Sequence, residues 1–287
     1  GIFNTFRNPD KETVLTPWRV VNMHISDCLG GWCFMDEEFK QPLETPRFVD
    51  KGEVTHSVFR ADSLIMEINS KSGLYPLLAA YNIYRNRLEA AKEKYGEVGN
   101  AFAMQLWDLT IEQNILVVCK TPMARSITRR TLVGFRDTKV HAEYYKNLIE
   151  NISQNSDLVV NTLRDGKNFW GINENKHMTI DAIIGNPPYQ VVDGGGNGAA
   201  AIPIYNKFVC TAKDMHPHYI SMIMPAKWYG GGRGLDDFRK MMLNETHIDY
   251  IKDFPNPKSV FPTANISGGV CSVSYTHLRA HETDQYL

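Results

Sequence analysis

The fold is decided by the stretch Asp181-Ala-Ile-Ile-Gly185-Asn186-Pro187-Pro188-Tyr189. Its first half is a short apolar run, which is typical of a strand buried on both faces of a parallel sheet. The two prolines end the strand because each fixes its own φ angle and lacks an N–H for the sheet. The stretch therefore predicts a buried strand with a rigid turn at its carboxyl end, where Asn186 and Tyr189 are presented.

Similar apolar runs recur along the chain and alternate with amphipathic stretches. We predict strands at 63–68, 114–119, 157–161, 181–185, 219–224, 248–253 and from Ile266 onward. We predict helices at 75–94, 202–212 and 235–243. Buried strands that alternate with helices are typical of a doubly wound sheet. The pattern predicts an α/β fold with one mostly parallel, seven-stranded sheet.

The composition narrows the class of protein. No apolar run is long enough to span a bilayer and no secretory signal opens the chain, so we expect a cytoplasmic protein without a membrane partner. The formal net charge of -1 gives no support for nucleic-acid binding from composition alone, although a basic patch can be local. The five cysteines include no CxxC pair, which argues against a zinc ribbon or a disulfide framework.

The turn at 186–189 has the groups that an amino-group transfer needs. The side-chain oxygen of Asn186 and the carbonyl of Pro187 can both accept hydrogen bonds from one NH₂ group. Two such acceptors leave the nitrogen lone pair directed at an electrophile. Tyr189 offers a flat face for a planar base. The alternative interpretation is an ordinary Asn-Pro turn after a strand.

The strand and tetrapeptide resemble motif IV of amino-methyltransferases. From about Thr13 to Ser272, the chain resembles the adenine-specific DNA methyltransferases of restriction–modification systems, particularly the Eco57I-like group. The resemblance implies a Rossmann-like class I methyltransferase fold, S-adenosyl-L-methionine as cofactor and no metal. It implies double-stranded DNA with a flipped adenine as substrate, and a restriction nuclease, fused or separate, as partner. The catalytic residues it implies are Asn186, Pro187, Pro188 and Tyr189.

The resemblance also implies which residues hold the cofactor. Residues 12–21 are similar to motif X, and residues 67–75 are similar to motif I with a single glycine in the loop. The cofactor-binding residues implied are Thr16, Pro17, Glu67, Asn69, Gly73 and Asn161. Thr16-Pro17 is also typical of a helix start, with Thr16 as N-cap and Pro17 as the first helical residue. No acid follows the second predicted strand, so the ribose-binding residue is unassigned.

Two segments near the carboxyl end complete the resemblance. Residues 223–239 are similar to the segment after the fifth strand, and residues 254–270 are similar to motif VIII. The likeness implies that Phe261 stacks on the target base opposite Tyr189; the alternative is a core phenylalanine. The motif order places a target-recognition region after the catalytic domain.

The tail from Val273 reads VSYTHLRAHETDQYL and resembles a translated sequencing adapter. We therefore expect residues 1–272 to be the methyltransferase catalytic domain, as a partial gene product, and residues 273–287 to be an artefact. The target-recognition region is then expected to be missing. The spacing of His277 and His281 is accordingly not interpreted as a metal-binding pair.

Two other functions stay open at this point. The same tetrapeptide occurs in amino-methyltransferases that act on a protein glutamine or on ribosomal RNA. Motif I, with its single glycine, also fits a degenerate domain, a remnant that binds DNA without methylating it. Cofactor binding separates an enzyme from such a remnant. The other amino-methyltransferases tend to have a compact glycine-rich motif I and to lack the long glycine-rich segment that runs here from Trp228 to Arg239.

Overall fold

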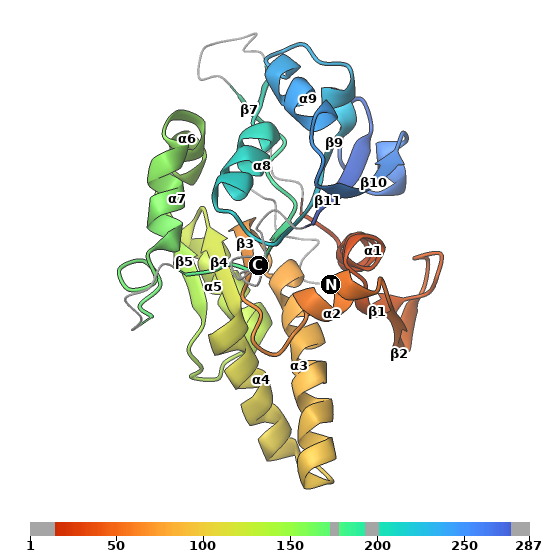
Figure 1. Ribbon diagram of the computed structural model, residues 1–287, viewed down its shortest axis with the longest axis vertical. Helices are drawn as coiled ribbons and strands as arrows, with labels where there is room; N and C mark the ends of the chain where they lie inside the picture. The colour runs from red at the N-terminus through yellow and green to blue at the C-terminus, as the bar shows by residue number, and fades with distance from the viewer. Residues whose placement is uncertain (1–14, 173–177, 193–200, 277–287) are drawn as a thin grey trace, which may run out of the picture.

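The computed structural model describes residues 15–172, 178–192 and 201–276. Its centre is a seven-stranded sheet with the order β10-β11-β9-β6-β3-β4-β5 (Figure 1). The strands are β3 (Ile65–Ser70), β4 (Ile115–Cys119), β5 (His141–Tyr144), β6 (Ala182–Gly185), β9 (Tyr219–Pro225), β10 (Ile248–Phe254) and β11 (Val270–Tyr275). Neighbours from β5 to β9 are parallel, and β11 runs antiparallel between β9 and β10. The predicted doubly wound, mostly parallel sheet is confirmed.

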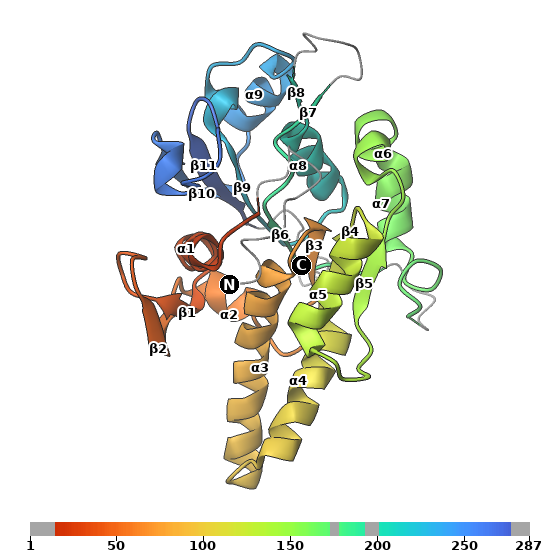
Figure 2. The ribbon, with the colours of Figure 1, turned by 180° about the vertical axis from the view of Figure 1, so that it is seen from behind.

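Helices cover both faces of this sheet, as Figures 1 and 2 show from opposite sides. One face carries α1 (Trp18–Cys28), α3 (Leu74–Tyr95), α4 (Asn100–Asn114) and α5 (Pro122–Val133); the other carries α6 (Leu148–Gln154), α7 (Ser156–Arg164), α8 (Tyr205–Asp214) and α9 (Asp236–Leu243). Successive residues of β3 enter different cores, with Ile65 in the first and Met66 in the second. This alternation explains why the strands are apolar throughout.

Shorter elements surround this sandwich. They are β1 (Gly31–Met35), β2 (Pro42–Val49), α2 (Glu53–Val58), β7 (Gln190–Val192), β8 (Ala201–Pro203) and the 3₁₀ turns η2 (Ala226–Tyr229) and η3 (Pro257–Ser259). The hairpins β1-β2 and β7-β8 are each antiparallel. Helices α3 and α4 lie side by side and project away from the sheet in both views.

The predicted strand at 157–161 is wrong. These residues lie in α7, where the side chain of Asn155 caps the helix by accepting from the N–H of Leu158. A short apolar run does not distinguish a strand from a buried helix, and here Val159 and Leu163 are buried at helical spacing. The third strand is β5. Asn161 is therefore exposed on a helix, and the strand end that its assignment as a cofactor ligand required does not exist.

The structure also extends the folded domain past Ser272. Val273–Tyr275 complete β11, are buried and pair with both β9 and β10. The hydroxyl of Tyr275 donates to the Sδ of Met242 at 2.8 Å. The predicted domain boundary thus falls inside a strand, and residues 277–287, including His277 and His281, lie outside the described residues. The adapter origin of the tail stays a prediction.

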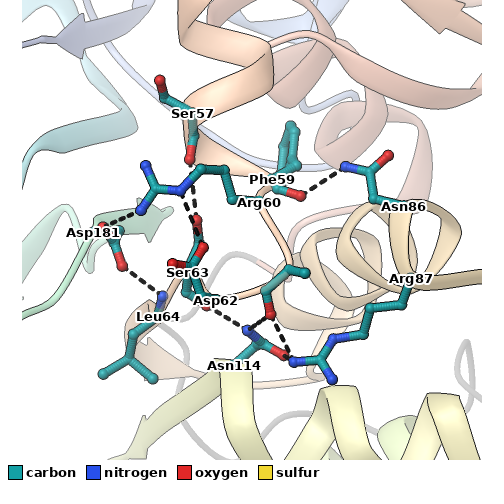
Figure 3. A network of polar contacts seen from close by, with 11 residues as sticks. Ser57, Phe59, Arg60, Asp62, Ser63, Leu64, Asn86, Arg87, Asn114 and Asp181 are labelled. Carbon is teal, nitrogen blue, oxygen red and sulfur yellow. Dashed lines mark hydrogen bonds and ion pairs between the residues drawn. The ribbon is translucent and has the colours of Figure 1, made fainter. Parts of the chain in front are cut away.

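A polar network holds the amino ends of the central strands together (Figure 3). The Nδ2 atom of Asn114 donates to the carbonyls of Ala61 and Ser63 at 3.0 and 2.7 Å. Its Oδ1 accepts from Arg87 at 3.0 Å. Asp181 accepts from the N–H of Leu64 at 2.8 Å, which ties the start of β6 to the start of β3. This clasp lies at the opposite end of the strands from the motif IV turn.

Removal of Asn114 from this clasp is expected to lower stability. Asn114→Ala leaves the carbonyl of Ser63 without this donor and the carbonyl of Ala61 with Arg87 alone, and we expect the free energy of unfolding to fall by about 1–3 kcal/mol. Urea unfolding followed by circular dichroism measures the loss. The control is Gln113→Ala, which removes an exposed neighbour that also accepts from Arg87. Equal losses for the two variants would contradict this account of the clasp.

Candidate active site

The sheet has a topological switch point between β3 and β6. From β3 the chain continues to β4 and β5 on one side, whereas β6 leads to β9 on the other. Glu67 on β3 is in register with Ile184 on β6, so the residues that follow these two strands are neighbours in space. Open α/β sheets bind ligands in the crevice at such a point. Motif I and motif IV are therefore brought together by the topology.

The motif I loop turns sharply between β3 and α3. Asn69 adopts φ +72, an uncommon conformation for a residue other than glycine. Gly73, at the amino end of α3, has φ +75, and a Cβ there would lie 3.1 Å from the Cα of Thr128. The loop is held from within, because the hydroxyl of Ser70 accepts from the N–H of Gly73 at 3.2 Å. The single glycine predicted for the turn is thus the one that close packing requires.

Polar atoms without partners collect on this loop. The Oε2 atom of Glu67 and both amide atoms of Asn69 are buried and have no hydrogen-bond partner. Burial raises the pKa of Glu67 to about 7. Buried polar groups are nearly always hydrogen-bonded in folded proteins, so such a cluster is typical of a ligand site. These are the atoms predicted to hold the cofactor.

Asn186 follows β6 directly and joins motif IV to motif X. Its Nδ2 donates to the hydroxyl of Thr16 at 2.9 Å, while its Oδ1 is buried without a partner. The Oδ1 of Asn186 is thus fixed in orientation and left free to accept a hydrogen bond. Thr16 is not the N-cap of α1 as predicted. Pro17 takes that position, its carbonyl accepting from Val20 and Val21, and the hydroxyl of Thr16 is engaged by Asn186 instead.

Tyr189 and Phe261 line one pocket of about 930 Å³ beside this turn. Their ring centroids are 6.3 Å apart with an interplanar angle of 77°, an edge-to-face contact. Phe261 is 1% exposed, so it belongs to the core as well as to the pocket wall. Pro17 also lines the pocket, which places motifs X, IV and VIII around the same space. The sequence interpretations of Phe261 as core residue and as pocket residue are compatible.

Arg19 is a residue whose role the sequence did not indicate. Its guanidinium donates to the carbonyls of Ser259 and Val260, at 2.6 and 3.1 Å, across the gap between α1 and the motif VIII loop. These two bonds hold the backbone immediately before Phe261. No local pattern predicts a contact between residues 240 positions apart.

Loss of Arg19 is expected to loosen the wall of the pocket. For Arg19→Gln we expect kcat/KM for the pocket's substrate to fall about tenfold, because two charge-assisted hydrogen bonds position Phe261. Steady-state kinetics measures this change, and calorimetry is expected to give an unchanged affinity for the motif I ligand. Arg47→Gln, which removes similar bonds to the carbonyls of Met35 and Asp36 on the β1-β2 hairpin, is the control. Equal kinetic losses in both variants would contradict the positioning role.

A series of hydrogen-bonded, buried polar side chains lies next to the candidate site. The Nδ1 of His24 lies 2.7 Å from the hydroxyl of Tyr75, and its Nε2 lies 3.0 Å from the hydroxyl of Ser221. Burial lowers the pKa of His24 to about 3, so the ring is neutral at neutral pH. These hydrogen bonds link α1, α3 and β9. Motif X extends into α1, motif I extends into α3, and β9 leads to residues of the pocket.

A model of the Eco57I restriction-modification methylase family matches residues 113–261, just over half of the chain. The chain belongs to the Eco57I restriction-modification methylase family. The family match covers Asn186 to Tyr189 and ends at Phe261, so the motif IV turn and the aromatic pocket wall both lie within the region shared with this family.

This Eco57I-family chain is similar in sequence to a methylase. It is 40% identical over 96 residues to an uncharacterized adenine-specific methylase of Mycoplasma pneumoniae (strain ATCC 29342 / M129 / Subtype 1), which is 33% of this chain and 23% of the relative. The fold is similar to that of the type I restriction enzyme EcoKI M protein, with a TM-score of 0.50 and 11% identity over 94% of this chain and 45% of the other. It is also similar to a nuclease-deletion mutant of the type ISP restriction-modification enzyme LlaGI in complex with a DNA substrate mimic, with a TM-score of 0.52 and 14% identity over 92% of this chain and 23% of that enzyme. This Eco57I-family chain thus spans less than half the length of each of these proteins.

In residues 15–172, 178–192 and 201–276, no helix is both long and apolar enough to cross a membrane. The same residues include no group of three or more His, Cys, Asp or Glu side chains placed to hold a metal ion.

Proposed function

We propose that this chain is the catalytic portion of a restriction–modification enzyme that transfers a methyl group from S-adenosyl-L-methionine to the exocyclic amino group of adenine in double-stranded DNA. The target adenine first leaves the stacked bases of the duplex and then enters the pocket. An enzyme cannot otherwise align a methyl donor with an exocyclic nitrogen that lies inside a duplex. Family membership and the adenine-specific relative support this choice of substrate.

One observation carries the proposal. The Oδ1 of Asn186 is a buried acceptor without a partner, held in place through the bond from its own Nδ2 to Thr16. A fixed, unpaired acceptor beside an aromatic pocket is suited to bind an amino group and orient its lone pair. The ordinary turn that the sequence left open would not need such an unpaired buried oxygen.

The residues of motif I fit the methyl donor. Glu67 and Asn69 offer a carboxylate and an amide without partners, which are suited to the charged amino and carboxylate groups of a methionine moiety. Gly73 allows the helix start to approach closely. From motif X, Thr16 is bonded to Asn186, and Pro17 lines the pocket beside Tyr189. When bound there, S-adenosyl-L-methionine supplies an electrophilic methyl group, and the chain contributes position and electrostatics rather than a covalent intermediate.

The base-binding roles follow from the pocket. Tyr189 offers its ring to the target base, and Phe261 supports that ring and forms part of the same wall. Pro187 and Pro188 keep the turn rigid and leave its carbonyls without competing N–H groups. A restriction nuclease, on the same chain or on a separate one, completes the system in this proposal.

Binding of the methyl donor tests the proposal first. We expect S-adenosyl-L-methionine to bind the purified chain at one site, with heat measured by titration calorimetry, and the demethylated product S-adenosylhomocysteine to compete for it. A chain that binds DNA but neither of these ligands would be a DNA-binding remnant, and the proposal would then fail.

A further inference from the structure

The charged side chains that line the pocket of Tyr189 and Phe261 all have the same sign. Two of the described residues that line it carry charged side chains, Lys227 and Arg233, and both are cations. No carboxylate is among the described lining residues. This bias stands out because the chain as a whole has 31 basic and 32 acidic residues. A cavity with this charge attracts an anion.

Within the described part of the chain, the ammonium of Lys227 and the guanidinium of Arg233 make no hydrogen bond or ion pair. By contrast, nearby Arg239 donates to the carbonyl of Tyr229 and has a structural task. An unpaired cation at a pocket wall is available to a ligand.

The backbone holds both cations at the pocket. Arg233 has φ +50, a conformation that costs a residue other than glycine about 1 kcal/mol or more. The loop before it is fixed because Asp236 accepts from the N–H of Gly232 at 2.8 Å. Lys227 lies against Gly268, where a Cβ would approach its Cγ to 3.0 Å. The fold thus retains a strained backbone conformation at Arg233 and a glycine without a side chain beside Lys227.

We infer that Lys227 and Arg233 form a clamp for the backbone phosphates on either side of the flipped adenosine. The inference rests on the DNA substrate proposed above. A base that enters between Tyr189 and the opposite wall stays joined through its sugar to two phosphodiesters, which must then lie at the mouth of the same pocket. Lys and Arg are the side chains that bind such phosphates, and these contacts fix position without reading sequence. Lys227 and Arg233 are therefore positioning residues rather than catalytic ones.

Salt dependence of DNA binding tests the clamp. The probe is a fluorescein-labelled G·C duplex with one adenosine opposite an abasic site, and anisotropy gives its Kd at several salt concentrations. Each phosphate contact contributes about 0.9 to the slope of log K against log salt. We expect Lys227→Gln and Arg233→Gln each to reduce the slope by about 0.9, and the double variant by about 1.8. The control is Lys146→Gln, an exposed lysine outside the pocket, which is expected to leave the slope unchanged.

Neutral linkages locate the contacts. Methylphosphonates on both sides of the target adenosine are expected to weaken binding by the wild type and to have no effect on the double variant. The same linkages near the duplex ends are expected to have no effect on either protein. Unchanged slopes in the variants, or equal sensitivity of wild type and double variant to the flanking methylphosphonates, would overturn the clamp. Failure of the proposed function gives a different result, because the wild type would then transfer no methyl group whatever the binding slopes are.

Discussion

Asn186→Ala is expected to reduce methyl transfer by about 10²–10³-fold, the usual loss on removal of a preorganised hydrogen-bonding group at a reacting centre. The loss arises because the Oδ1 of Asn186 is the buried, unpaired acceptor beside the pocket. Affinity for S-adenosyl-L-methionine is expected to change less than about threefold, since cofactor binding rests on the motif I residues. Single-turnover transfer of a labelled methyl group and titration calorimetry measure the two quantities.

The control for this variant is Asn244→Ala, which removes an exposed amide that donates to the carbonyl of Lys240. It is expected to keep both methyl transfer and cofactor affinity. If Asn186→Ala retained more than a tenth of the wild-type rate, Asn186 would not be the acceptor for the amino group. Simultaneous loss of methyl transfer and cofactor binding would indicate a folding defect, which circular dichroism detects.

Glu67→Gln is expected to weaken cofactor binding and to stabilise the free protein at alkaline pH. The buried carboxyl has a pKa of about 7 in the folded chain, against 4.5 as its ordinary value. Because folding raises this pKa, the contribution of Glu67 to stability is fully present below pH 4.5 and is lost as the pH rises through 7. Between pH 5 and pH 8.5, we expect the stability of the variant relative to the wild type to rise by about 2–3 kcal/mol.

The difference in stability between variant and wild type separates the contribution of Glu67 from that of His24. The pKa of His24 falls from 6.5 to about 3 on folding, so its contribution is present above pH 6.5 and is lost as the pH falls toward 3. That change occurs equally in both proteins and cancels in the difference. Urea unfolding at the two pH values measures stability, and calorimetry is expected to show cofactor affinity at least tenfold weaker in Glu67→Gln.

Glu150→Gln serves as the control for Glu67→Gln because Glu150 is exposed on α6. It is expected to show no pH-dependent stabilisation and normal cofactor binding. A variant at Glu67 that bound the cofactor as tightly as the wild type would remove Glu67 from the cofactor site. A flat stability difference between pH 5 and pH 8.5 would show that the carboxyl is not buried as described.

Patterns along the sequence predicted the class of sheet, six of its seven strands and the position of motif IV, but they missed β5. The strand before Asn186 was recognisable because an apolar run ends at two prolines, and this combination has few alternatives. The run at 157–161 failed because its apolar residues satisfy both strand and helix spacing; the Asn155 cap that makes it a helix is a weak signal in sequence. The assignment of Asn161 to the cofactor site had rested on that strand, and without it stays an untested prediction.

Contacts between distant segments were beyond the reach of sequence patterns. The bond from Asn186 to Thr16 and those from Arg19 to the motif VIII loop join residues that are 170 or more positions apart. Periodicity reports which face of an element is buried, but not which side chain meets it. In the sequence, Lys227 and Arg233 are only two members of the segment 223–239, and the structure is needed to show that they line the same pocket.

The identity of the methylated product tests the central claim most directly. The measurement incubates the chain in excess with methyl-labelled S-adenosyl-L-methionine and DNA, digests the DNA to nucleosides and identifies the labelled species by mass spectrometry. The account predicts label in N6-methyldeoxyadenosine from the wild type, and label that forms about 10²–10³-fold more slowly from Asn186→Ala. Label found only in a protein glutamine or in RNA, or absent from DNA although S-adenosyl-L-methionine is bound, would contradict it.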